Sequence, residues 1–166
     1  MLRKALPFLL ALTWMLSCDQ LFYAQLKEDS SPEQPVFQTG SNPDFSGQAL
    51  VHRVSVFGRP RTPTSPDTAR SWRTFWELAL DSGVRHVGLR EVTYGLAPVG
   101  LHPVVGPESL RAGYVYSCHF ACSGLSPTVY FEIALDRKTI RVIRPLHAEQ
   151  WQHVTGLRDS DAVDRN

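Results

Sequence analysis

Three consecutive runs of β-forming residues near the C-terminus constrain the fold of this chain most strongly. The runs are GYVYSCHF at 113–120, TVYFEIAL at 128–135 and TIRVIRPL at 139–146. Their β-branched and aromatic residues favour strands, and the short polar break at Asp136–Lys138 favours a tight turn. Alternate residues of the middle run share one face: Val129, Phe131, Ile133 and Leu135. We therefore predict an antiparallel meander of three strands.

The segment 66–83, with the sequence PDTARSWRTFWELALDSG, has the spacing of an amphipathic helix. Ser65 suits the N-cap, Pro66 the first helical position and Gly83 the C-terminal stop. Aromatic residues at helical spacing usually pack against a sheet, although two tryptophans on one stripe could form a binding platform. The predicted apolar face consists of Ala69, Trp72, Phe75, Trp76, Ala79 and Leu80.

Two further runs, 49–57 and 84–95, have the composition of strands. Together these elements predict an α+β fold: an antiparallel sheet of four to five strands with one main amphipathic helix packed on one face. We expect a single domain over residues 49–157, which ends in a short helix at 147–154. A disordered tail is expected at 158–166.

Residues 19–48 are rich in Ser, Pro, Gln and acidic residues and show no hydrophobic period. Such a composition predicts a flexible tether, with an end-to-end distance of roughly 30 Å for thirty residues. The alternative is an extension that packs along the domain through Val36, Phe37 and Phe45.

The first eighteen residues have the pattern of a secretory signal peptide. Arg3 and Lys4 precede an uncharged apolar run from Ala5 to Leu16. This run of about twelve residues is too short to span a bilayer, which needs roughly 20. The segment therefore predicts export.

The end of this segment, WMLSC at 14–18, resembles the lipobox of bacterial lipoproteins. The resemblance covers residues 1–18 and departs from the commonest form at Met15 and Leu16. It implies that Cys18 is diacylated on sulfur and becomes the new N-terminus. Two acyl chains anchor a protein stably in a membrane. In Gram-negative lipoproteins an aspartate after the cysteine often marks retention in the inner membrane, and Asp19 occupies that position.

Cys118 and Cys122 are the two thiols that remain if Cys18 carries lipid. An even pair in an oxidising compartment favours a disulfide. Four residues of a continuous strand span roughly 13 Å, whereas bridged Cα atoms lie within about 7 Å, so the backbone must turn between them. A metal site with His119 would need a fourth ligand, and thiol catalysis would need His119 on the same side as Cys118. We predict a disulfide, no metal and no cofactor.

The sequence contains none of the common catalytic motifs: no nucleophile elbow, phosphate-binding glycine loop, zinc-protease motif or dinucleotide fingerprint. Removal of residues 1–18 leaves 15 basic against 16 acidic residues, so we expect no nucleic-acid binding.

We expect a non-enzymatic lipoprotein of the bacterial envelope that faces the periplasm and binds another envelope protein, as an accessory subunit or an immunity factor. One alternative is an envelope enzyme or small-ligand binder that uses His119 with carboxylates of the sheet. The other is a secreted protein without lipid, in which Cys18 is lost with the signal.

Overall fold

The computed structural model describes residues 22–62, 72–122 and 126–143 of the chain. Within these ranges the protein is all β: two antiparallel sheets, with no helix. The α+β prediction was therefore wrong. The described ranges also contain no helix that is long and apolar enough to cross a membrane.

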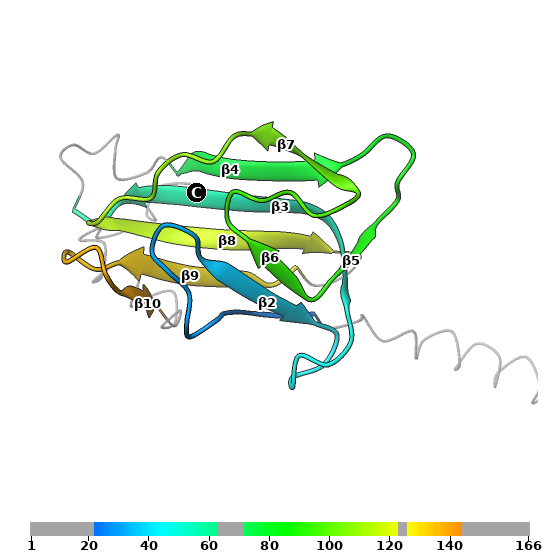
Figure 1. Ribbon diagram of the computed structural model, residues 1–166, viewed down its shortest axis with the longest axis horizontal. Helices are drawn as coiled ribbons and strands as arrows, with labels where there is room; N and C mark the ends of the chain where they lie inside the picture. The colour runs from blue at the N-terminus through cyan, green and yellow to red at the C-terminus, as the bar shows by residue number, and fades with distance from the viewer. Residues whose placement is uncertain (1–21, 63–71, 123–125, 144–166) are drawn as a thin grey trace, which may run out of the picture.

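The two sheets differ in size and lie against each other. The smaller has the order β1 (Tyr23–Leu26), β2 (Val36–Gly40), β6 (Glu91–Thr93). The larger has the order β10 (Ile140–Val142), β9 (Thr128–Ile133), β8 (Tyr114–Cys122), β3 (Ala49–Pro60), β4 (Arg73–Leu80), β7 (Leu101–Val105), and β5 (Val87–Leu89) pairs with the first residues of β3. In Figure 1, β2 and β6 cross in front of the larger sheet.

The meander predicted from the three C-terminal runs is present as β8, β9 and β10, which pair in antiparallel order. Val129, Phe131 and Ile133 lie on the buried face of β9, as their alternation indicated. Leu135, expected on the same face, lies beyond the end of the strand and is 86% exposed.

The predicted main helix is the principal error, because residues 73–80 form β4 instead. Val56 pairs with Trp76 and Phe57 with Thr74, so Phe75 is an extra residue in β4, a β-bulge. Neighbouring residues of a regular strand point to opposite faces, but this bulge lets Phe75 and Trp76 both enter the core. Phe75 and Trp76 are adjacent and both buried, a pattern that a regular strand does not give but that one face of a helix can. The start of the predicted helix, residues 66–71, lies outside the described residues.

The segment predicted as a tether contributes β1 and β2 to the smaller sheet. Phe37 of β2 is fully buried, so the domain begins well before residue 49. The alternative of an extension packed along the domain fits this arrangement. The predicted signal peptide, the C-terminal helix at 147–154 and the tail at 158–166 lie outside the described residues.

The contact between the sheets centres on Phe37. Its ring lies 6.2 Å from the ring of Phe120 on β8 and 5.5 Å from that of Phe131 on β9. Phe131 in turn stacks on Tyr116 at 5.2 Å. Aromatic pairs at these distances stabilise a core beyond the area they bury, and here they join three strands from two sheets.

The chain crosses from the larger to the smaller sheet at Arg90, between β5 and β6. Thr39 of β2 is fully buried, and its backbone N–H donates to the Arg90 carbonyl at 2.8 Å. Its hydroxyl donates to the Leu89 carbonyl, also at 2.8 Å. Thr39 therefore donates hydrogen bonds to two backbone carbonyls at the point where the chain passes from one sheet to the other.

The loop between β7 and β8 covers the part of the core that the smaller sheet leaves uncovered. Leu110 and Ala112 pack against the core, and the Tyr116 hydroxyl accepts from the Arg111 N–H at 2.6 Å. The Tyr94 hydroxyl donates to the Glu108 carbonyl at 2.6 Å. Both tyrosines thus bury their rings while their hydroxyl groups hold this loop.

Gly58 of β3 lies beneath the aromatic cluster, and we predict that Gly58→Ala destabilises the domain. An added Cβ would meet the Tyr116 ring at 2.7 Å and the Phe75 ring at 2.8 Å. Overpacking of this kind costs about 1–3 kcal/mol in the free energy of unfolding, which urea denaturation measures. In the control, Gly106→Ala, the Cβ meets nothing within 4 Å, so we expect a change within about 0.5 kcal/mol. Equal stabilities of the two variants would contradict this packing.

Candidate functional site

The predicted disulfide is not formed, because Cys118 and Cys122 are both free thiols. Both lie on β8, which continues without a turn from Tyr114 to Cys122. The turn that a disulfide would require is therefore missing, and both side chains are buried on the inner face of the strand. Burial raises the pKa of the Cys118 thiol well above its usual value and the pKa of Cys122 to about 11. Neither thiol is activated as a nucleophile.

His119 lies on the opposite face of β8 from the two cysteines. Its register neighbours are Ser55 on β3 and Thr128 on β9, so the strands bring no carboxylate directly beside it. Burial lowers the pKa of His119, which favours a neutral imidazole at pH 7. Among the described residues, no group of three or more His, Cys, Asp and Glu side chains is placed to hold a metal ion.

Three carboxylates of the sheets are candidates for an acid–base pair: Glu91 lies on the smaller sheet, whereas Glu132 and Asp136 line one cleft of the larger sheet. Glu91 binds Lys27 on the smaller sheet, with 2.9 Å between Oε1 and Nζ. Glu132 binds Arg61 at the larger sheet, with 2.6 Å between Oε2 and Nη1. Asp136 accepts from the Lys138 N–H at 2.9 Å, and this hydrogen bond holds the pKa of Asp136 below its usual value. Each carboxylate thus has a structural partner.

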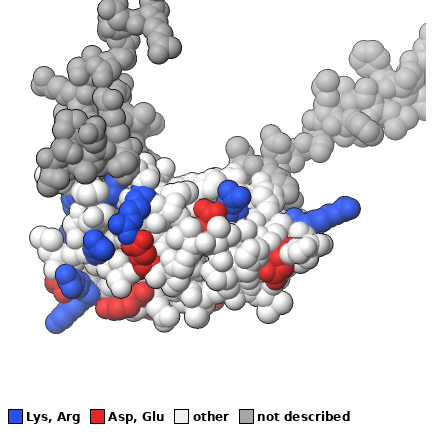
Figure 2. Space-filling model, turned by 90° about the horizontal axis from the view of Figure 1, so that it is seen from above, with Lys and Arg blue, Asp and Glu red and all other residues white. Residues whose placement is uncertain are grey.

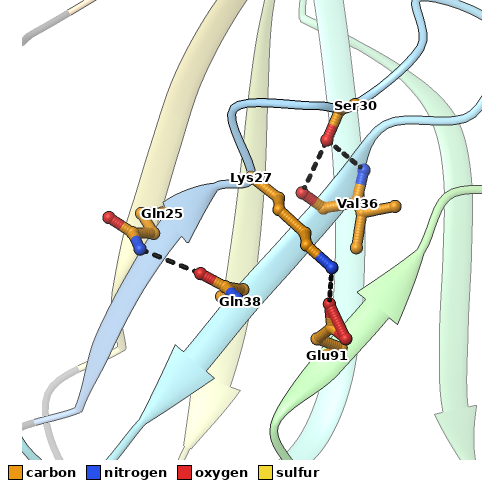
Figure 3. A network of polar contacts seen from close by, with 6 residues as sticks. All are labelled: Gln25, Lys27, Ser30, Val36, Gln38 and Glu91. Carbon is orange, nitrogen blue, oxygen red and sulfur yellow. Dashed lines mark hydrogen bonds and ion pairs between the residues drawn. The ribbon is translucent and has the colours of Figure 1, made fainter. Parts of the chain in front are cut away.

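The outer face of the smaller sheet is polar (Figure 3). Gln25 donates to Gln38 across the β1–β2 pair at 3.0 Å, and the ion pair of Lys27 with Glu91 lies on the same sheet. These side chains bind one another in an exposed position, where ion pairs contribute little to stability. In Figure 2, basic and acidic residues are interspersed over the visible face and form no patch of one sign.

The two edges of the larger sheet differ in how well they are protected. Edge strands are open to pairing with another chain unless proline, bulges or charges block them. β7 contains Pro103, and its register with β4 is shifted by a bulge at Val104. In the described part of the chain, β10 lies at the other edge; it has no proline and no bulge, and Arg141 is its one charged residue.

The backbone of β10 is oriented for pairing. The Ala134 N–H donates to the Thr139 carbonyl at 2.9 Å, and the Ile143 N–H donates to the Tyr130 carbonyl at 2.9 Å. In an antiparallel ladder, the residues that bond to one neighbour alternate with residues directed to the other side. The N–H and C=O groups of Ile140 and Val142 therefore point away from β9, toward the edge.

A groove of about 290 Å³ lies between β10 and the end of β1. Leu26, Ile140 and Val142 give it apolar walls, with Lys27 and Lys138 at its rim. Val142 belongs to the inner face of the sheet because it pairs with the buried Phe131, yet it is 54% exposed. The sandwich is thus open at this edge.

A larger cleft of about 600 Å³ lies on the other face of the β9–β10 hairpin. Arg141 pairs with Glu132 across the two strands, and Arg61 binds the same carboxylate. Leu135, 86% exposed, adds an apolar side chain to the lining. We name the two hollows and the strand between them the β10 edge site, which comprises Leu26, Arg61, Glu132, Ile140, Arg141 and Val142.

Sequence reasoning located β10 but did not identify it as a binding edge. The alternation of 139–146 showed a strand, but which strand lies at the edge of a sheet depends on long-range pairing. Leu26 came from the segment assigned to the tether. The one local signal was Val142, an apolar residue that follows Arg141 in a short strand near the end of the domain.

Comparison with known proteins identifies no relative of this chain. No protein-family model, no curated protein and no solved structure matches it. Its function must therefore be inferred from its own residues.

We predict that both thiols react with an alkylating reagent in denaturant without prior reduction, because they are free. In the folded protein both should react slowly at pH 7, since raised pKa values leave little thiolate. Labelling of Cys122 should accelerate as pH rises toward its pKa of about 11. Mass spectrometry counts the labels, and Cys122→Ser should remove the pH-dependent one. A requirement for reductant before any label enters would contradict free thiols.

Proposed function

We propose that this chain is a membrane-anchored lipoprotein of the bacterial envelope whose β-sandwich binds another protein along the β10 edge site. The observation that carries the proposal is an edge strand without proline or bulge, with a groove of mixed polar and apolar lining on one face and a cleft lined by charged and apolar side chains on the other. The domain acts as a binding module rather than as an enzyme.

An extended segment of the partner is the occupant that this edge suits. Such a segment adds a strand to a sheet through main-chain hydrogen bonds, and pockets on alternate faces give specificity. The outward groups of Ile140 and Val142 supply the main-chain bonds. The edge is only three residues long, so side-chain contacts must add to the affinity.

The two faces of β10 define the side chains that the partner should carry. Toward the inner groove, beside Leu26 and Val142, an apolar side chain fits. Toward the outer cleft, a polar or charged side chain can bind beside Arg61, Glu132 and Arg141. We expect a partner strand that alternates apolar and polar residues.

The membrane anchor is supported by the sequence of residues 1–18, and it generates a separate prediction. Protein purified from bacterial membranes should have an intact mass that begins at Cys18 and includes acyl chains. Cys18→Ser should move the protein from the membrane to the soluble fraction. A mass without lipid, with the wild-type chain in the soluble fraction, would favour the secreted alternative instead.

For the edge, we predict that Val142→Pro sharply weakens partner binding while the domain stays folded. The Val142 N–H points away from β9, so proline removes a bond to the partner but none within the sheet. An unsatisfied partner carbonyl costs about 1–3 kcal/mol of binding free energy. The readout is a photo-crosslinker at Lys138, in cells that make the full-length protein.

The matched control for this variant is Val142→Thr, which keeps the N–H and the shape and should retain most of the crosslinking. A crosslinker at Gln38, on the polar face of the smaller sheet, should give no adduct with the same partner. Adducts that persist in Val142→Pro, or that form equally well from Gln38, would refute the proposed edge. Thermal unfolding of both variants checks that the fold is intact.

A further inference from the structure

The loop from Gly95 to Gly100 has the sequence GLAPVG, with no polar side chain, yet it lies on the surface. Val99 is 97% exposed and Leu96 55% exposed. A wholly apolar exposed loop is costly in water unless another surface covers it. Backbone hydrogen bonds hold this loop in place: the Leu96 N–H donates to the Thr93 carbonyl and the Leu101 N–H to the Pro98 carbonyl, both at 3.0 Å.

A second exposed loop, residues 81–86, lies against the first. The Asp81 N–H donates to the Gly100 carbonyl at 3.0 Å. A side chain placed at Gly100 would meet Val87 at 2.8 Å and Val84 at 3.9 Å. Val84 is itself 37% exposed and is followed by the exposed Arg85. Val99 of the first loop and Val84 of the second form an exposed surface that we name the apolar tip.

The apolar tip lies at the end of the sandwich where the described chain begins. Tyr23 pairs with Gly40, at the arrowhead of β2 in Figure 1, and the loop between β4 and β5 lies at the same right-hand end. Phe22 follows the proposed lipid-bearing Cys18 by only four residues. A fully extended chain covers at most about 3.6 Å per residue, so this link reaches about 14 Å.

So short a link holds this end of the sandwich at the surface of the membrane. We infer that the apolar tip rests in the headgroup region of the bilayer that holds the anchor, an inference that builds on the lipoprotein part of the proposed function. Val84 and Val99 enter the boundary between headgroups and acyl chains, where apolar side chains are favoured.

Charge has little part in this contact. The second loop contains the exposed Arg85 and also Asp81, which binds His102 at 3.0 Å. One basic and one acidic residue balance, so the two loops have no net attraction to anionic lipid. The contact therefore depends on the apolar side chains and on the short link to the anchor.

The test uses an environment-sensitive fluorophore on the full-length, lipidated protein reconstituted into vesicles of phosphatidylethanolamine and phosphatidylglycerol. Val99→Cys and Val84→Cys carry the label at the tip, and the buried native thiols react too slowly to compete at pH 7. Glu33→Cys, in the exposed turn between β1 and β2 at the opposite end, is the matched control. All three sites are exposed, so the variants should fold normally.

We expect blue-shifted emission at positions 84 and 99, and its loss when the vesicles contain nitroxide-labelled lipids. Position 33 should report water in both cases. The shift should persist in vesicles of phosphatidylcholine, which carry no net charge.

If all three labels report water while the protein stays on the vesicles, the inference is overturned and the anchor stands. If position 33 is as deeply inserted as position 99, the inference is overturned because the domain lies in another orientation. Protein that does not bind the vesicles at all overturns both the inference and the anchor. Partner crosslinking at the β10 edge is measured separately and does not depend on any of these outcomes.

Discussion

The packing of Phe37 between Phe120 and Phe131 is the interaction on which the two-sheet arrangement depends. The smaller sheet has only three short strands, too few to be stable without a hydrophobic face to cover. The larger sheet in turn has an inner face rich in aromatic residues that must be shielded from water. Phe37 meets both needs, and Thr39, two residues later on the same strand, binds the carbonyls where the chain changes sheets.

The sequence allowed the strands to be predicted where the hydrophobic period is regular. The runs that became β8, β9 and β10 were identified correctly as an antiparallel meander, and β9 alternates most regularly. β4 was mistaken for a helix because the bulge at Phe75 breaks the two-residue period and brings Phe75 and Trp76 together. A bulge is fixed by the partner strand, so local pattern alone could not reveal it.

The structure differs from the predicted tether and the predicted disulfide for related reasons. Composition marked residues 19–48 as unable to fold by themselves, yet β1 and β2 gain their stability from the larger sheet rather than from their own residues. The paired thiols suggested a bridge, but Cys118 and Cys122 serve as small apolar residues on the inner face of a continuous strand. The candidate site also depends on pairing between distant segments, because β10 becomes an edge strand only in the assembled sheet.

The two proposals place different surfaces on different sides of the molecule. The apolar tip lies at the end where β1 begins, whereas the turn between β9 and β10 lies at the opposite end. If the tip rests on lipid, the far end of the β10 edge site points away from the bilayer. A partner could then approach the edge without competing with the membrane.

The order of the strands also has a consequence for how the chain acquires its structure. The centre of the larger sheet is the pairing of β3 with β8, in which Pro60 lies opposite Tyr114 and Val51 opposite Cys122. If the chain is exported as proposed, it emerges with its N-terminus first, and β3 leaves the translocon long before its central partner. Contacts so distant in sequence close slowly, and unpaired strands aggregate readily. Until the second half of the chain arrives, the first half therefore needs a chaperone or a nearby membrane surface to stay unaggregated.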